Sequence, residues 1–154
     1  MADNTEVRVV SATRDITAGV EHLFELIADP SQQPRWDGND NLTLAPADQR
    51  VRAVGDVFTM TLTTGAEREN HVVEFEEGRL IAWLPSEAGQ PPPGHLWRWE
   101  LEPIDGSHTR VTHTYDWTDL TEEKRLVRAR ATTAHNLDAS LGRLAALAEG
   151  NAST

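Results

Sequence analysis

The stretch GHLWRWELEPIDGSHTRVTHTYDWT, residues 94–118, contains two segments in which large rings alternate with smaller or charged side chains. Successive side chains of a strand point to opposite faces, so this alternation predicts strands over 95–103 and 109–118. The Asp105–Gly106 pair between them is a strong hairpin signal. A solid core would use Leu, Ile and Val, which need no hydrogen-bond partner. One shared face of this hairpin instead carries rings with polar groups: Trp97, Trp99, His113, Tyr115 and Trp117.

Five more short strands are predicted before this hairpin. Each is rich in β-branched or aromatic residues and is bounded by turn-forming residues. A loop stiffened by three prolines at 91–93 connects the last of them to the hairpin. The strands are expected over 6–16, 41–47, 56–64, 70–77 and 79–85.

Two short helices are predicted after the first strand. Leu23, Phe24 and Ile27 recur at helical spacing within 18–30. This helix should stop before Pro30, because the residue before a proline disfavours the α region. The segment 31–38, SQQPRWDG, is expected to form a second short helix or a turn.

A long helix is predicted at the C-terminal end. Thr121 is a suitable N-cap, and the acidic residues after it suit the first turn. The helix should run almost unbroken to Gly150, a natural stop, which leaves 150–154 as a frayed tail. The basic cluster at 124–130, KRLVRAR, is expected to be a solvated face. The stripe that faces the sheet is predicted to be Leu126, Arg130, Ala134, Leu137, Leu141, Leu144 and Ala148.

The predicted order is therefore a strand, two short helices, six strands and a long helix. Consecutive hairpins make the sheet antiparallel, and the alternation leaves one face wet and the other covered. Glu74 and Arg98 are expected on the wet face. The covered face is predicted to carry Phe58, Met60, Leu62, His71, Val73, Phe75, Ile81, Trp83, Trp97, Trp99, His113, Tyr115 and Trp117.

Composition narrows the class of protein. The 154 residues suit a single domain, and a formal net charge of -11 argues against nucleic acid or an anionic membrane surface as partner. No apolar run approaches the roughly 18 residues that span a bilayer. The chain has no cysteine, and its first residues lack the pattern of a secretory signal. We therefore expect one cytoplasmic domain over 1–154, without membrane insertion; the sequence does not predict its oligomeric state.

The order of elements, the segments ADPSQQPRWDG (28–38) and EFEEGRLIAW (74–83), and the long terminal helix together resemble the START-like or SRPBCC superfamily, in particular its polyketide cyclase/dehydrase branch. The similarity covers almost the whole chain. It implies an α+β helix-grip fold, in which a curved seven-stranded antiparallel sheet wraps around the C-terminal helix and leaves a deep cavity for an apolar ligand. Fold does not fix function, which depends on the site.

A cavity would explain the aromatic face. Rings give a ligand large apolar contact, and indole, phenol and imidazole groups add a few orienting hydrogen bonds. Trp36 is expected near one entrance. The predicted ligand-binding residues are Trp36, Phe58, Met60, His71, Phe75, Trp83, Trp97, Trp99, His113, Tyr115, Trp117, Arg130, Thr133 and Leu137.

Three residues are candidates for acid–base chemistry. His113 could remove a proton, and Tyr115 or Arg130 could stabilise an oxyanion. Each has a plainer alternative. The rings could simply pack, and Arg130 could extend past the rim with a buried stem and a wet head. On the strand order that the resemblance implies, His71 and His113 would lie three strands, or roughly 14 Å, apart, and neither has a carboxylate pair beside it. We therefore predict no metal site, and we expect no cofactor.

Three functions remain open from the sequence. The first is binding of a small hydrophobic, aromatic or polycyclic ligand between the sheet and the C-terminal helix. The second is a polyketide cyclase, aromatase or dehydratase that acts on such a ligand. The third is a co-chaperone-like module that docks a protein. The aromatic face favours the first two, and the charged outer face gives the third little support.

Overall fold

In the described part of the chain, one antiparallel sheet of seven strands organises the fold. The computed structural model describes residues 7–36, 42–45 and 47–152. The strand order across the sheet is β1-β7-β6-β5-β4-β3-β2, and every neighbouring pair is antiparallel. The predicted helix-grip sheet is confirmed. The strands are β1 (Val9–Ile16), β2 (Leu42–Leu44), β3 (Val57–Leu62), β4 (Glu67–Glu76), β5 (Leu80–Glu87), β6 (Leu96–Asp105) and β7 (His108–Asp116).

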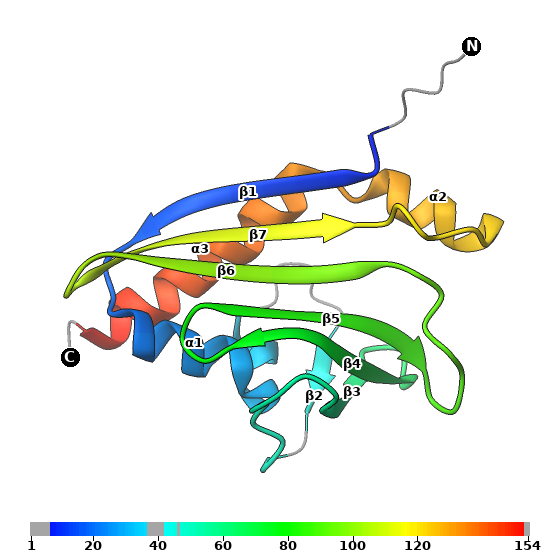
Figure 1. The fold of residues 1–154 in the computed structure, drawn as a ribbon, viewed down its shortest axis with the longest axis horizontal. Coiled ribbons are helices and arrows are strands. Elements are labelled where there is room, and N and C mark those ends of the chain that lie inside the picture. The colour runs from blue at the N-terminus through cyan, green and yellow to red at the C-terminus, as the bar shows by residue number, and fades with distance from the viewer. Residues whose placement is uncertain (1–6, 37–41, 46, 153–154) are drawn as a thin grey trace.

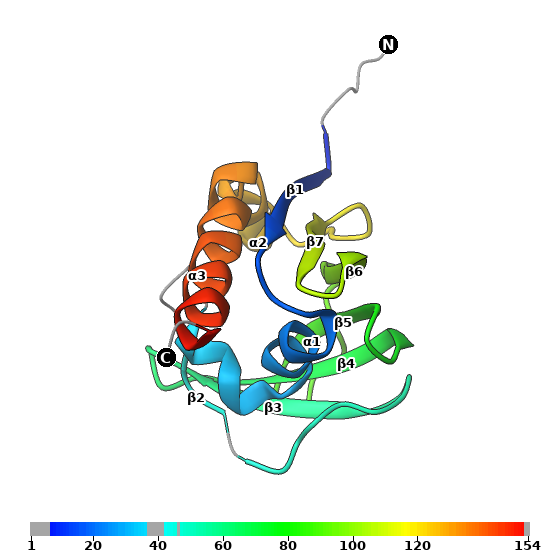
Figure 2. The same ribbon diagram turned by 90° about the vertical axis from the view of Figure 1, so that its left-hand side faces the viewer.

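The helices lie on the concave side of this curved sheet (Figures 1 and 2). α1 (Val20–Ala28) and the 3-10 helix η1 (Pro30–Arg35) follow β1, as the sequence predicts. Beyond β7 come α2 (Glu123–Ala131) and α3 (Ala134–Ala152), and α3 runs beside β1 along one edge of the sheet (Figure 1). None of the helices in the described part of the chain is long and apolar enough to cross a membrane.

The end of α1 is held by side chains of the segment that follows it. Asp29 ends the helix before Pro30, and its carboxylate accepts the Ser31 N–H at 3.1 Å. The Gln33 side-chain amide donates to the Ile27 carbonyl at 3.1 Å, and the Trp36 indole N–H donates to the Leu26 carbonyl at 2.8 Å. These bonds satisfy carbonyls that the last turn of a helix leaves without partners. They also fix the ring of Trp36.

A β-bulge in β4 corrects the predicted register. Val72 pairs with Trp83, but the next pair joins Glu74 to Ala82, so Val73 is an extra residue. A bulge shifts the alternation of side chains by one residue. Even-numbered residues of β4 therefore face inward before the bulge, and odd-numbered residues face inward after it. Phe75 therefore points inward as predicted, while Asn70 and Val72 point inward in place of His71 and Val73. The inward placement of His71 and Val73 is wrong for this reason.

The C-terminal helix is broken, which corrects the prediction of one nearly continuous helix over 121–150. Thr132 leaves the helical region with ψ 114°, and the next helix starts at Ala134, directly after Thr133. The side-chain oxygen of Asn136 accepts the Thr133 N–H at 2.9 Å, in the manner of a capping box. α3 also continues to Ala152, so Gly150 does not end it, and most of the predicted frayed tail up to there is helical. Residues 153–154 lie outside the described part of the chain.

Two groups of buried side chains form the core. The larger fills the space between the sheet, α1 and α3, with Ile16, Phe24, Ile81, Leu141 and Leu144 among its fully buried members. The outer face of the same sheet carries the ion pair between Arg98 and Glu74 at 2.7 Å, as the alternation predicts. The smaller group lies where β7 meets α2: Tyr115, Trp117, Leu120, Leu126, Ala129 and Leu137.

Candidate functional site

The inner face of β6 and β7 forms a continuous aromatic wall. Trp99 lies opposite His113 in the register, and Trp97 lies opposite Tyr115. The His113 ring stacks on Trp99 with centroids 3.7 Å apart and on Trp97 at 5.4 Å. Trp97 and Tyr115 are 4.4 Å apart. Cross-strand ring pairs of this kind stabilise a sheet, and here they also present a flat apolar surface.

His113 is held as a neutral ring inside this wall. Its Nδ1 lies 3.1 Å from the Arg98 carbonyl oxygen, to which a protonated Nδ1 donates. Burial lowers the pKa of His113 to about 3. A neutral imidazole with its proton on Nδ1 leaves Nε2 as an acceptor. Burial likewise raises the pKa of Tyr115 to about 12, so its phenol stays protonated and can donate.

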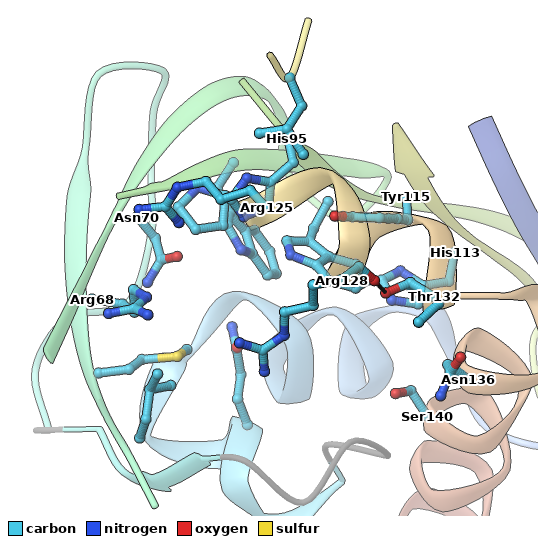
Figure 3. A pocket seen from close by; sticks show the side chains of 18 of the residues that line it. Arg68, Asn70, His95, His113, Tyr115, Arg125, Arg128, Thr132, Asn136 and Ser140 are labelled. Carbon is cyan, nitrogen blue, oxygen red and sulfur yellow. Dashed lines mark hydrogen bonds between the residues drawn. The ribbon is translucent and has the colours of Figure 1, made fainter. Parts of the chain in front are cut away.

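A cavity of about 710 Å³ opens against this wall and is enclosed by η1, β3 to β7, α2 and α3 (Figure 3). Its volume falls within the usual range for small-molecule sites. The aromatic part of its lining is Trp36, Trp83, Trp97, Trp99 and Tyr115, together with the imidazoles of His95 and His113. Polar side chains that lack a formal charge complete much of the remaining inner surface: Gln33, Asn70, Thr132, Asn136 and Ser140.

Two buried nitrogen atoms in the cavity lining have no hydrogen-bond partner within the described part of the chain. They are the indole Nε1 of Trp99 and Nδ1 of His95. Trp99 is only 1% exposed, so water does not readily satisfy this donor. A buried donor without a partner is costly, and a native structure rarely leaves one without a reason. By contrast, the indole N–H of Trp36 is already used by the Leu26 carbonyl.

Four cationic side chains line the cavity. Arg68 comes from β4, and Lys124, Arg125 and Arg128 come from α2. Arg125 pairs with Glu87 of β5 and with Glu122, at 2.5 and 3.0 Å. Burial, and then the positive charges of Arg125, Arg68 and Arg128, lower the pKa of His95 to about 4.

Seven of the predicted ligand-binding residues line this cavity. They are Met60, Trp36, Trp83, Trp97, Trp99, His113 and Tyr115. Four more lie in the core behind or beside it. Phe58 packs against Trp83 at 5.3 Å, Phe75 packs against Phe24 at 5.7 Å, and Trp117 and Leu137 belong to the smaller buried group.

Three predicted residues are not brought to the cavity. The His71 ring lies on the other face of β4, with Nε2 3.1 Å from the Ser86 hydroxyl. Thr133 is exposed and caps α3. Arg130 is also exposed, with its guanidinium carbon 6.0 Å from the centroid of the Trp117 ring, so the expectation that it faces the cavity is wrong.

The same helix break explains the cationic residues that the sequence prediction missed. A continuous helix would place Arg130 on the stripe that faces the sheet. Because α2 ends at Ala131, its direction is set independently of α3, and Lys124, Arg125 and Arg128 face the cavity instead. The cluster KRLVRAR is the signal for these residues in the sequence. Lys124 and Arg128 are exposed, as the prediction of a solvated face has it, but they also line the cavity, and Arg125 is half-buried.

A curved antiparallel sheet that closes on a C-terminal helix around a ligand-sized cavity defines a helix-grip protein. The chain belongs to the polyketide cyclase / dehydrase and lipid transport family, whose model matches residues 8–149. Within the described residues, no three His, Cys, Asp or Glu side chains are grouped so that they could hold a metal ion.

A relative from Mycobacterium tuberculosis and two solved structures are among the proteins similar to this chain. The uncharacterized protein Rv0088 of Mycobacterium tuberculosis is 27% identical over 111 residues, which are 70% of this chain and 47% of the relative. The chain thus spans about half the length of the curated relatives it matches. The structure of MLL2253 from Mesorhizobium loti has a TM-score of 0.68 at 18% identity and covers 93% of this chain and 98% of its own. PFC0360w, an HSP90 activator from Plasmodium falciparum, has a TM-score of 0.57 at 17% identity and covers 88% and 97%. At these identities the two structures share the fold.

Proposed function

We propose that the chain binds a small hydrophobic, ring-containing molecule in the cavity between the sheet and the C-terminal helices. The observation that carries this proposal is the wall of stacked rings, which borders a cavity of about 710 Å³ and contains the unpartnered indole N–H of Trp99. A planar ligand would gain ring contact with this wall.

An enzyme of the cyclase or dehydratase type is the second candidate. The family description and the presence of His113 and Tyr115 in the cavity favour it. A general base works best when its pKa lies near the working pH. The pKa of His113, about 3, is far from neutrality, which makes this ring a weak general base and supports binding ahead of catalysis. The protonated phenol of Tyr115 could still donate to an oxyanion.

A protein-docking role has less support. The exposed large apolar side chains of the described residues form at most a small group. Val57 of β3 pairs with His71, two residues from Val73 of β4, while Ile104 in β6 and Val127 in α2 lie on other elements. Exposed apolar groups of this size are normal on a monomer. The likeness to an HSP90 activator concerns the fold and does not supply a docking surface.

The binding proposal is tested by titration with a neutral aromatic probe, anthracene-2-carboxamide, followed by tryptophan fluorescence. We expect a saturable change in the wild-type protein, because four of the five tryptophans line the cavity. Trp99→Phe should weaken binding by about tenfold, since it removes part of the aromatic surface that lines the cavity. Mass spectrometry of the recovered probe would show whether it is altered.

Trp117→Phe is the matched control, because Trp117 is as buried as Trp99 but does not line the cavity. It should bind the probe as the wild type does. Circular dichroism checks that both variants are folded. Absence of any saturable change in the folded wild-type protein would contradict the proposal.

A further inference from the structure

The charge around the cavity opposes the charge of the whole chain. The full sequence has 25 acidic and 14 basic side chains. The cavity lining, within the described residues, has four cationic side chains against two carboxylates, Glu87 and Glu122. A lining that served only an apolar ligand would gain nothing from this reversal. Local excess of one charge in a cleft attracts ligands of the other charge.

The two carboxylates do not cancel this excess. Both are paired with Arg125, at 2.5 Å for Glu87 and 3.0 Å for Glu122. The Arg68 guanidinium donates a hydrogen bond to the Glu67 carbonyl oxygen at 3.3 Å. Within the described part of the chain, neither Arg68 nor Arg128 forms an ion pair. Two guanidinium groups therefore remain available to an incoming anion.

These two arginines approach the cavity from different elements. Figure 3 shows Arg128 extending from α2 into the middle of the cavity and Arg68 on the opposite side, on β4. Burial is the largest cause of the lowered pKa of His95, and the positive charges of Arg125, Arg68 and Arg128 lower it further. All three guanidinium groups therefore act on the same imidazole. Arg128 also acts on the Tyr115 phenol. The positive potential thus lies next to the aromatic wall.

We propose that the ligand of this cavity is an aromatic carboxylate. Its rings would lie on the wall of Trp97, Trp99 and His113, and its carboxylate would be bound between Arg68 and Arg128. Guanidinium groups match carboxylates in planar, two-bond geometry, which makes arginine well suited to this task. The inference rests on the proposed binding function and adds the charge of the ligand to it.

The test compares two probes of nearly equal shape, anthracene-2-carboxylate and anthracene-2-carboxamide. Isothermal titration at low ionic strength should give a dissociation constant for the carboxylate that is lower by about tenfold or more. Raising the salt concentration should reduce this preference and leave the amide unaffected, because salt screens charge.

Variants locate the effect. Arg128→Gln and Arg68→Gln should each weaken carboxylate binding by about tenfold and change amide binding by less than about twofold. Arg52→Gln is the control, because Arg52 is exposed and does not line the cavity. Arg128→Lys keeps the charge and should recover part of the carboxylate affinity.

The outcomes separate this inference from the binding proposal beneath it. Equal affinity for the two probes in the wild-type protein would overturn the carboxylate inference and leave ring binding intact. Binding of neither probe would overturn both. Loss of carboxylate and amide binding together in a folded Arg128→Gln would show that the arginine supports the cavity and does not select the anion. The comparison in the wild type and its salt dependence need no variant to fold.

Discussion

His113 links the aromatic wall to acid stability. Its folded pKa of about 3 lies below the ordinary value of 6.5, as does that of His95, at about 4. At a pH between the folded pKa and the ordinary pKa of 6.5, each of these histidines binds a proton in the unfolded chain but not in the native protein. Stability therefore falls as the pH drops below about 6.5, by up to about 1.4 kcal/mol per pH unit for each such histidine. Above about pH 6.5 this contribution is complete.

Replacement of His113 should flatten this dependence. We expect the free energy of unfolding of His113→Gln to fall less between about pH 7 and about pH 5 than that of the wild type. Urea denaturation at a series of pH values measures the difference. His135→Gln, on the exposed side of α3, should retain the wild-type slope. Identical slopes for the wild type and His113→Gln would show that His113 does not titrate in this way.

The histidines and the ion-paired glutamates lose their contributions to stability at different pH values. Hydrogen bonds from Arg98 and Arg50 lower the pKa values of Glu74 and Glu77 below the usual 4.5. Stability from these glutamates is present above their unfolded pKa and is lost only as the pH falls below it. Measurements above about pH 5 therefore report chiefly on the histidines.

At the scale of elements, the junction between α2 and α3 sets the charge of the cavity. Asn136 stabilises the start of α3 through bonds from the Thr133 N–H at 2.9 Å and the Thr133 hydroxyl at 3.2 Å. The Thr132 hydroxyl donates to the Arg128 carbonyl at 3.1 Å at the end of α2. Two β-branched residues with side chains that bond locally favour a break over a continuous helix.

Asn136→Ala should destabilise the protein by about 1 kcal/mol, because the Thr133 N–H loses its side-chain acceptor. Thermal or urea unfolding measures this loss. Asn136→Asp keeps an acceptor and adds a negative charge near a helix N-terminus, so it should match or exceed the wild-type stability. If Asn136→Ala and Asn136→Asp unfold alike, the side-chain bond is not what holds the junction.

The sequence predicted the elements better than their local irregularities. Hairpin signals and alternation were enough for the sheet, and the inward placement of Trp97, Trp99 and His113 followed from period two alone. The bulge at Val73 could not be predicted from the sequence, because no residue type in this strand marks the position at which the pairing shifts. A sequence pattern that does not reveal the bulge or the helix break cannot predict the inward face of β4 or the place of Arg128 in the cavity lining.

At the scale of the molecule, an acidic surface encloses a cationic cavity. The net charge of -11 produces repulsion among surface carboxylates in the folded state. Added salt screens this repulsion, and it screens the closely paired, partly buried bridge of Arg50 with Glu25 and Glu77 less strongly. Salt should also weaken attraction between the cavity and an anionic ligand. Added salt should therefore stabilise the folded protein and weaken the binding of an anionic ligand.

We expect the melting temperature of the ligand-free protein to rise as sodium chloride increases from about 0.02 M to about 0.5 M. Over the same range, the affinity for anthracene-2-carboxylate should fall. Differential scanning calorimetry and titration on one preparation measure the two responses. The neutral amide probe is the control, and its affinity should not decrease. A melting temperature that falls with salt would mean that surface ion pairs outweigh the excess of negative charge. A carboxylate affinity that rises with salt would mean that apolar contact, and not the arginines of the cavity lining, governs binding.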